Sequence, residues 1–369
     1  MEVTTIGIDL AKSVFAVCGA DASGKVVLRK LLRRAQVLPF FRALRPCLVG
    51  MEACGGAHWW ARQLGELGHT VKMMNPHTVA SYRSGPKHDF NDAEAACEAV
   101  TRARVRAVTP KSLAQQDLLA LHRARQFLIK QHTGWSNQLR ALLHERGITV
   151  AKGSTALRRT LAQLPEDNPD LSGEMRELLR TMGQYWEQCH QHIAELDAQL
   201  ERKCRDDERC QRLDQVTGIG PIIATAVVGI VGNGSEFRRG RELSAYLGLV
   251  PGQHSSGGKT VLLGITKHGN RYLRTLLIHG ARSALRTCAQ RSDALSCWMY
   301  QVLQRQGANV AAVAVANKLA RIIWALLQSG RSYDPRRAAC APSPAPAGES
   351  AAPQPAPHHK LHLLMDGGD

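Results

Sequence analysis

The sequence predicts three folded parts: an α/β domain, a long helical hairpin, and a mostly α-helical C-terminal domain. Short β-rich runs alternate with helical segments in the first hundred residues. The middle of the chain has apolar residues at helical spacing, and the last third opens with two apolar helical segments around a Gly-Pro turn. We place the domains at residues 1–110, 111–212 and 213–330, followed by a Pro/Ala-rich tail at 331–369.

The first domain is expected to contain a mixed β-sheet flanked by helices. Three β-rich runs, 'TTIGIDLA', 'SVFAVCGA' and 'KVVLRKLL', are separated by short polar breaks, which indicates an antiparallel meander. A short helix, a buried strand ('PCLVGME'), a helix ending at Gly68, a strand ('HTVKMMNP') and a last helix ('DAEAACEAVTRAR') follow. This order predicts a sheet covered by helices, but it does not give the order of the strands within the sheet.

A helical hairpin is predicted for the middle of the chain. The stretch from Leu118 to Leu142 forms one arm, and the break 'LPEDNPDLSG' joins it to a longer amphipathic arm. A self-contained hairpin and a dimerising coiled coil both fit this pattern. The apolar stripe of the longer arm consists of Met175, Leu178, Met182, Tyr185, Cys189, Ile193, Leu196 and Leu200.

The C-terminal domain begins with 'LDQVTGIGPIIATAVVGIVG', two apolar helical segments around a 'GIGP' turn. This form is like a helix-hairpin-helix element, in which backbone N–H groups at a helix start bind a phosphate. A Gly-Pro turn between two core helices would look the same, so both interpretations stay open. After Gly330 the chain is rich in Pro and Ala, and we expect it to be disordered and to contain no active site.

The charge balance points to a polyanionic partner. Lys and Arg outnumber Asp and Glu by 48 to 31, which gives a net charge of +17. The excess is uneven, because the segment 236–286 holds nine Lys or Arg and two Glu. Such a concentration is more typical of a nucleic-acid-binding surface than of a solvated basic face.

The absence of a predicted membrane span and signal peptide, together with the cysteine pattern, predicts a cytoplasmic protein. The chain has no run of about 18 apolar residues, which predicts no membrane span, and 'MEVTTIGIDLAK' lacks the features of a signal peptide. The ten cysteines are scattered without a CxxC pair, as expected of buried thiols in a reducing compartment. Cys189, His190 and His192 have no second cluster that would complete four ligands, so we expect no zinc site there.

Four carboxylates lie at strand ends and at a helix start, where α/β domains commonly have their catalytic residues. Asp9 ends the first strand in 'GIDLAK', Glu52 ends the fourth in 'VGMEACGG', and Asp89 and Asp92 begin the last helix in 'KHDFNDAEA'. Each acid alone could be a helix cap or a solvated loop residue. Together they favour a site for divalent cations, because clustered carboxylates repel one another and Mg²⁺ prefers oxygen ligands. Two such ions can stabilise the attacking and leaving oxygens of a phosphodiester.

A second candidate site is the stretch 'GLVPGQHSSGGKTVLLGITKHGN', which holds Ser255 and Ser256 close to Lys259 and Lys267. A surface turn is the ordinary interpretation. The alternative is a nucleophile that attacks a DNA phosphate and keeps the phosphodiester energy in a phosphoserine link. Serine is a poor nucleophile at its own pKa, and this stretch contains no acid. The four carboxylates would therefore have to meet the serine, within one chain or between protomers.

These motifs resemble those of the DEDD insertion-sequence transposases, which are related to the pilin-gene invertase Piv. The first domain is similar to the ribonuclease H-like fold in the form found in the RuvC Holliday-junction resolvase. The resemblance covers about residues 3–330, and the order of several motifs makes it specific. They are 'GIDLAK', 'GMEACGG', 'KHDFNDAEA', 'GIGP', 'YLGLVPGQHSSGGK', 'GITKHGNRYLRTLLIHGA' and 'ANKLARIIWALL'.

The resemblance implies that the four acids form a catalytic tetrad that binds Mg²⁺, or Mn²⁺ in its place. It also implies that a serine of the C-terminal transposase domain takes part in strand exchange. The family pattern of a Pro, a short spacer and Ser-Gly maps onto Pro251 and Ser256-Gly257, so Ser256 is the expected nucleophile rather than Ser255. The expected partners are DNA (element ends and target), a structured guide RNA and further copies of the chain. The sequence itself contains no sign of the RNA.

The leading hypothesis is a transposase that excises and inserts its own insertion sequence, acting in the cytoplasm at the nucleoid. One alternative is a RuvC-like structure-specific nuclease without covalent serine chemistry. Another is a non-catalytic nucleic-acid-binding protein. The residues expected to contact the nucleic acid are Arg238, Arg239, Arg241, Lys259, Lys267, Arg271 and Arg274.

Overall fold

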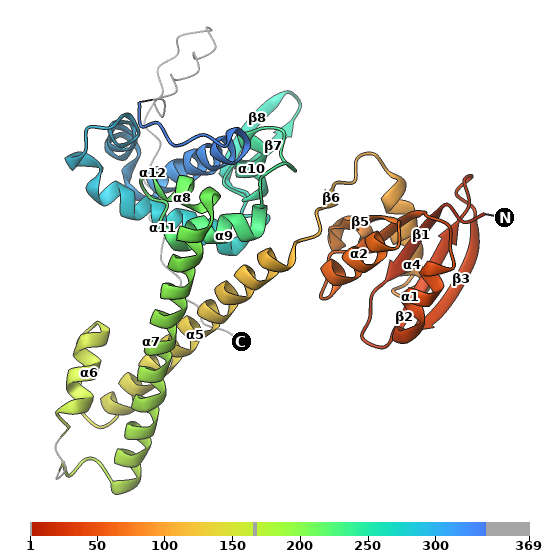
Figure 1. The fold of residues 1–369 in the computed structure, drawn as a ribbon. Helices are drawn as coiled ribbons and strands as arrows, with labels where there is room; N and C mark the ends of the chain where they lie inside the picture. Colours follow the sequence, from red (N-terminus) through yellow and green to blue (C-terminus); the bar gives the residue numbers. More distant parts are fainter. Residues whose placement is uncertain (1, 165–167, 337–369) are drawn as a thin grey trace.

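The structure is a computed structural model that describes residues 2–164 and 168–336. Most of the predicted tail therefore lies outside the described residues. The α/β domain comes first, followed by the helical hairpin and the C-terminal domain (Figure 1). Elements of the α/β domain are β1 Thr5–Asp9, β2 Val14–Ala20, β3 Val26–Arg33, α1 Arg34–Arg42, β4 Leu48–Glu52, α2 Ala57–Glu66, β5 Thr70–Met74, α3 Pro76–Ala80, α4 Asp89–Thr101 and β6 Ala107–Val108.

The sheet order is β3-β2-β1-β4-β5-β6, which the sequence did not predict. The antiparallel meander of β1, β2 and β3 is confirmed, and β1, β4 and β5 run parallel. The two-residue edge strand β6 and the five-residue helix α3 were not predicted, because both are too short to show a period. The carboxyl ends of parallel β1 and β4 meet at one edge of the sheet.

Helix α4 lies unusually close to the sheet because the strands facing it contain glycine. A Cβ atom at Gly7 would come 1.9 Å from the backbone oxygen of Ala93, and one at Gly50 would come 2.6 Å from the oxygen of Ala96. Only residues without side chains fit at these two positions. The close contact fixes α4, which begins at Asp89, against β1 and β4.

We expect Gly7→Ala to destabilise this domain by about 1–3 kcal/mol, because the added methyl group forces α4 away from the sheet. Hydrogen exchange of the α4 and β1 backbone amides measures the effect locally. Gly65→Ala is the matched control, since Gly65 lies in helix α2 and nothing lies within 4 Å of a Cβ built there. Equal protection in both variants would contradict the proposed role of Gly7.

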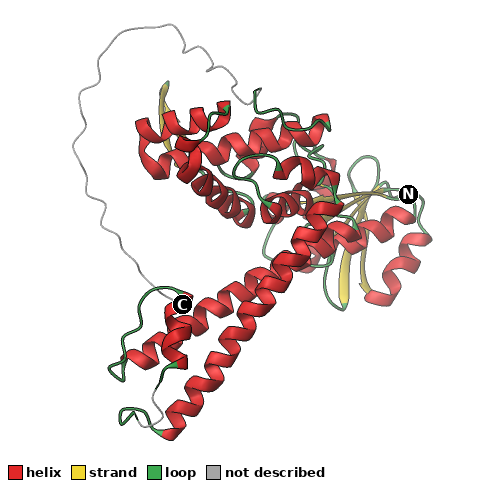
Figure 2. Cartoon of the chain, turned by 60° about the vertical axis from the view of Figure 1, so that its left-hand side comes forward, coloured by secondary structure: helices red, strands yellow, loops and turns green. Residues whose placement is uncertain are grey.

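The middle of the chain forms the predicted hairpin. Helix α5, Leu113–His144, and helix α7, Gly173–Asp206, pack against each other along their lengths (Figure 2). A short helix that was not predicted, α6 (Ser154–Ala162), lies between them. The tip has its own apolar cluster, which explains why it can project from the other domains. Its buried members are Leu139, Leu143, Leu157, Leu171, Leu179, Met182 and Trp186.

The C-terminal domain is mostly helical, as predicted, but it also contains a two-stranded sheet. The stretch that holds Ser255 and Ser256, for which the sequence predicted no strands, is a β-hairpin of β7 and β8. The long helix α12 bends at Gly307, whose φ is +74°. The elements are α8 Glu208–Asp214, α9 Pro221–Val231, α10 Gly240–Tyr246, β7 Pro251–Ser256, β8 Lys259–Ile265, α11 Arg271–Thr287, a 3-10 turn Cys288–Gln290 and α12 Ala294–Ser329.

Helix α12 is long and apolar enough, by length and composition alone, to cross a membrane. Of its most apolar stretch, 44% is buried inside the protein. The buried side chains, among them Val315, Leu319 and Ile323, pack in the same apolar cluster as Leu277 of α11 and Val227 of α9. Within this fold α12 is the core helix of the C-terminal domain.

Candidate active site

Backbone geometry brings the four predicted acids to one edge of the sheet. Asp9 is the last residue of β1 and Glu52 the last of β4, and the two strands pair in parallel up to their ends. Asp89 and Asp92 lie in the first turn of α4. Carboxylates are favourable there, because the unpaired N–H groups of a helix start carry partial positive charge.

Burial and neighbouring acids disfavour the ionised forms of Asp9 and Glu52. The pKa of Asp9 is raised to about 6, first by burial and then by the nearby charges of Asp92, Asp89 and Glu52, while Lys87 opposes the shift. The pKa of Glu52 is also raised, first by burial and then by Asp92. Ionised carboxylates disfavour one another at short range, so the neighbouring acids add to the larger effect of burial on both pKa values.

Two cations just before α4 partly balance this cluster, and the sequence analysis missed them. Arg83 donates to Oδ1 of Asp92 at 2.9 Å, and the Asp92 side chain is only 13% exposed. Arg83 and Lys87 both lower the pKa of Glu52. The available signal was their position in 'YRSGPKHDFND', directly before the acidic helix start.

The acid set fits a divalent metal by its chemistry. All four side chains are oxygen donors, which hard cations such as Mg²⁺ prefer, and their mutual repulsion is what such a cation would relieve. Within residues 2–164 and 168–336, no group of three or more His, Cys, Asp or Glu is close enough to hold a metal ion. The four acids therefore lie within range of electrostatic interaction but wider apart than a ligand set.

The predicted nucleophile lies at the tip of the β7–β8 hairpin. Gly257 and Gly258 form the turn, both with positive φ (+55° and +78°), as two-residue β-hairpin turns require. Ser256 is exposed and pairs with Lys259 across the hairpin. The hydroxyl of the neighbouring Ser255 accepts a hydrogen bond from Nε2 of Gln253 at 2.6 Å. The hairpin belongs to the C-terminal domain and lies apart from the α/β domain (Figure 1).

Most of the predicted phosphate contacts are exposed, and one is not. Arg238, Arg239, Arg271 and the others have exposed side chains. Arg274 is only 8% exposed, and its Nη1 donates to the backbone oxygens of Leu247 (3.0 Å) and His268 (2.8 Å). Its charge stabilises carbonyl groups next to the hairpin, which argues against a phosphate contact for Arg274. The exposed residues are Arg238, Arg239, Arg241, Lys259, Lys267 and Arg271.

The 'GIGP' turn connects α8 to α9, with Pro221 as the first residue of α9. One side of the turn packs tightly, since a Cβ atom at Gly280 of α11 would come 2.0 Å from the Gly218 oxygen. The turn also lines a cavity of about 450 Å³ between it and α11. It is therefore both a core contact and a surface feature, and phosphate binding at Gly220 stays a prediction.

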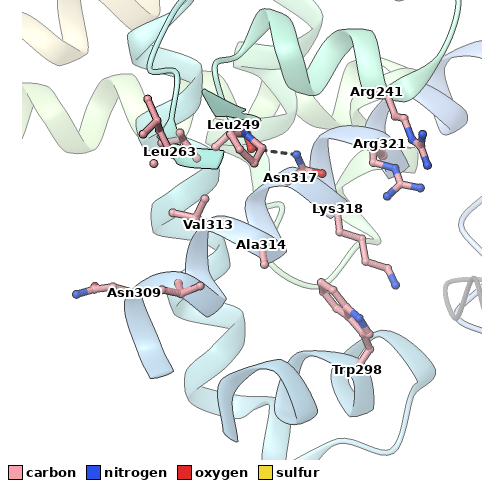
Figure 3. A pocket seen from close by; sticks show the side chains of 14 residues that line it. Arg241, Leu249, Leu263, Trp298, Asn309, Val313, Ala314, Asn317, Lys318 and Arg321 are labelled. Carbon is pink, nitrogen blue, oxygen red and sulfur yellow. Dashed lines mark hydrogen bonds between the residues drawn. The ribbon is translucent and has the colours of Figure 1, made fainter. Parts of the chain in front are cut away.

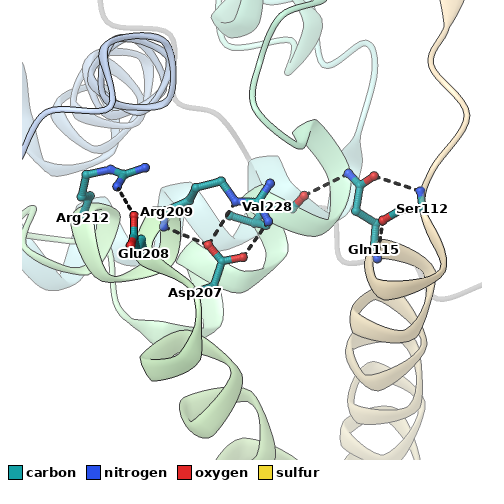
Figure 4. A network of polar contacts seen from close by, with 7 residues as sticks. All are labelled: Ser112, Gln115, Asp207, Glu208, Arg209, Arg212 and Val228. Carbon is teal, nitrogen blue, oxygen red and sulfur yellow. Dashed lines mark hydrogen bonds and ion pairs between the residues drawn. The ribbon is translucent and has the colours of Figure 1, made fainter.

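The segment that connects the α/β domain to helix α5 is hydrogen-bonded to the C-terminal domain. The Thr109 backbone N–H donates to Oε1 of Glu236 at 2.7 Å, and Lys111 Nζ donates to a carbonyl of α9 at 3.0 Å. The side-chain amide of Gln115 donates to the Val228 carbonyl at 3.3 Å (Figure 4). These contacts restrain the segment that leaves the α/β domain.

The chain thus joins a mixed sheet with four neighbouring carboxylates to a mostly helical domain with exposed Arg and Lys side chains. Two family models match the chain. Residues 6–147 match a DEDD transposase model, and residues 210–296 match the model described as "Transposase IS116/IS110/IS902 family". The chain belongs to this transposase family.

Similar proteins match almost the whole chain. A "Probable family 20 transposase" of Pseudomonas aeruginosa is 49% identical over 91% of this chain and 100% of its own length. The "Transposase for insertion sequence element IS1111A" of Coxiella burnetii is 40% identical over 90% of this chain and 92% of its own. The transposase for element IS1328 of Yersinia enterocolitica is 39% identical over 90% and 99%. The relation to the Piv invertase stays a prediction.

Proposed function

We propose that this transposase excises and inserts its insertion sequence with two sets of groups, the acid tetrad and Ser256. The observation that carries the proposal is the meeting of the acid-bearing ends of β1 and β4 with the acidic first turn of α4. DEDD transposases use divalent metal ions. Mg²⁺, or Mn²⁺ in its place, would be held by Asp9, Glu52, Asp89 and Asp92 and would supply charge neutralisation at the reacting phosphate.

Ser256 would attack the phosphorus of the strand to be exchanged and form a phosphoserine link while a free DNA end is released. Its exposure at a hairpin tip suits this role, because the hydroxyl is accessible to a DNA backbone. Lys259, which pairs with Ser256 across the hairpin, would contact a phosphate oxygen. The neighbouring Ser255 already accepts a hydrogen bond from Gln253, which favours Ser256 as the attacking residue.

The proposal requires the acid tetrad and the hairpin to meet, although they lie on separate domains (Figure 1). The hydrogen bonds from Thr109 and Lys111 to the C-terminal domain oppose a large movement of the connection within one chain. They support a homo-oligomer in which the hairpin of one protomer reaches the acids of another. A structured guide RNA, as the resemblance implies, would bind the exposed arginines and lysines of the C-terminal domain in the same assembly. The site of action would be the nucleoid.

The test is a strand-exchange reaction with DNA that carries the element ends and a target, with and without the transcript of the flanking non-coding DNA. Joined products that require the transcript and Mg²⁺ support the proposal. Free 3′-hydroxyl and 5′-phosphate ends without a protein–DNA link would identify a RuvC-like nuclease instead. Binding without any cleavage would identify a non-catalytic nucleic-acid-binding protein.

A separate prediction concerns DNA binding by two exposed arginines of the C-terminal domain. Arg238 and Arg239 are exposed, and the nearest acid to Arg239 is Glu242 at 3.8 Å. If both arginines neutralise phosphates, changing them to Ala lowers the slope of log affinity against log salt by about one unit per lost contact. A titration of duplex DNA at several salt concentrations measures this. Arg305→Ala, on an exposed turn of α12, is the matched control and should leave the slope unchanged.

A further inference from the structure

We propose that the C-terminal domain binds unpaired DNA along a track formed by two pockets and the three cations between them. We define the track by Arg241, Lys318 and Arg321, which line both pockets. This inference rests on the proposed function, because strand exchange exposes DNA strands that have lost their partners. It adds a binding site that the acid tetrad and the serine hairpin do not provide.

The first pocket has a volume of about 790 Å³ and lies between the base of the β7–β8 hairpin and α12 (Figure 3). The second has a volume of about 680 Å³ and lies between α10 and the end of α12. Both volumes fall within the roughly 300–1,000 Å³ typical of small-molecule sites, which suits a nucleoside. Since they share three side chains, the two pockets are neighbours separated by a cationic wall.

The bend in α12 gives the first pocket an aromatic side chain. Gly307 separates the arm that holds Trp298 from the arm that holds Lys318. The Lys318 ammonium lies 4.1 Å from the centre of the Trp298 ring, which fixes the indole at the pocket (Figure 3). An unpaired base can stack on such a ring, and stacking of this kind is tolerant of sequence.

The second pocket is also aromatic. Trp324 and Tyr333 line it, and Nε1 of Trp324 donates to the Phe237 carbonyl at 2.8 Å, which holds the ring in place. Aromatic residues make up only 5% of the chain, so three of them beside one cationic wall is a local concentration. A single strand with a phosphate at the wall and a base on each side would use all of these groups.

The charge of the track favours an anion with apolar faces. Among the described residues, three cations and no Asp or Glu line the first pocket, and one acid, Asp334, lines the second. Arg241 and Arg321 are exposed, and no ion pair joins either to another residue of the described part of the chain. The apolar rim is exposed too, at 53% for Leu263 and 55% for Val310. Duplex DNA hides its base faces, whereas an unpaired strand offers both phosphates and apolar rings.

The experiment measures the affinity of the full chain for labelled oligo-dT and for a hairpin duplex of the same length, at one salt concentration. Trp298→Ala should weaken oligo-dT binding about tenfold, the size expected for one lost stacked base, and should change duplex binding by less than about twofold. Trp298→Phe should retain most of the affinity. Arg321→Ala should weaken oligo-dT binding and reduce its salt dependence by about one unit.

Two matched controls separate the track from a general loss of charge or fold. Trp59→Ala removes an exposed Trp of the α/β domain, and Arg305→Ala removes an exposed Arg of α12 outside both pockets. Both should bind oligo-dT like the unaltered chain. Thermal melting checks that each variant is folded, and Arg321→Ala tests the track even if Trp298→Ala does not fold.

Three results would overturn the inference. They are an equal loss of affinity for duplex and oligo-dT, a loss confined to an oligo-U RNA of the same length, and unchanged oligo-dT binding by folded Trp298→Ala and Arg321→Ala. The assay needs no strand exchange. If strand exchange fails while the selective loss of oligo-dT binding is found, the proposed function fails and the track stands. If strand exchange is found but the variants show no selective loss of oligo-dT binding, the track is rejected and the proposed function is kept.

Discussion

Asp9→Asn should reduce strand exchange by at least about 10²–10³-fold, the size expected when one preorganised charged group is lost from a reacting phosphate. The same variant should melt at a higher temperature than the unaltered chain. The pKa of Asp9 is raised to about 6 in the folded protein from the ordinary value of 3.8, so its ionised form is less stable folded than unfolded. At neutral pH, an uncharged Asn removes this penalty. Product formation and thermal melting at pH 7 measure the two effects.

Asp21→Asn is the matched control for this prediction. Asp21 lies in the turn between β2 and β3 and accepts hydrogen bonds from Ser23 and Lys25, which hold the pKa of its carboxyl below the usual range. Its ionised form is therefore favoured in the folded state, and its loss should lower the melting temperature slightly without affecting strand exchange. Opposite changes in stability would distinguish a catalytic acid from a structural one. An Asp9→Asn chain that still exchanges strands, or that melts lower, contradicts the proposed role.

The acid cluster could be predicted because its geometry follows from local patterns. A β-rich run that ends in an acid fixes the place of Asp9 and of Glu52, and parallel pairing then brings both acids to one edge. The sheet order could not be predicted, because it depends on which strands pair over long distances in the chain. The ion pair between Arg83 and Asp92 was missed for a different reason, because Arg83 lies in the irregular connection before α4, where no periodic pattern shows which way a side chain points.

The C-terminal domain was harder to predict for a physical reason. A charged residue indicates a nucleic-acid-binding surface only when its side chain is exposed. Arg274 is buried against the backbone of a neighbouring turn, and no local sequence pattern reveals this contact. The glycines at 257 and 258 suit either a mobile loop or a tight hairpin turn, and the pairing of β7 with β8 decides between them. The bend at Gly307, which brings Trp298 to Lys318, lies inside a continuous apolar pattern.

Ser256→Ala should fold and bind DNA like the unaltered chain, yet neither exchange strands nor form a covalent link to DNA. The side chain is exposed at a hairpin tip, where loss of a hydroxyl normally changes the free energy of unfolding by less than about 0.5 kcal/mol. Covalent catalysis, in contrast, requires the one oxygen that attacks the phosphorus. Denaturing electrophoresis of labelled DNA incubated with the protein and Mg²⁺ detects the link as a shifted, protease-sensitive band.

Ser255→Ala is the control at the next residue of the same strand, and it should keep substantial activity. Its hydroxyl accepts a hydrogen bond from Gln253 in the hairpin, so its loss removes a structural contact and no attacking atom. A covalent link that persists in Ser256→Ala and disappears in Ser255→Ala would show that the neighbouring serine is the nucleophile. Cleavage by the unaltered chain without any such link would instead assign the reaction to the acids alone, because a metal-bound carboxylate cluster can hydrolyse a phosphodiester without a protein nucleophile.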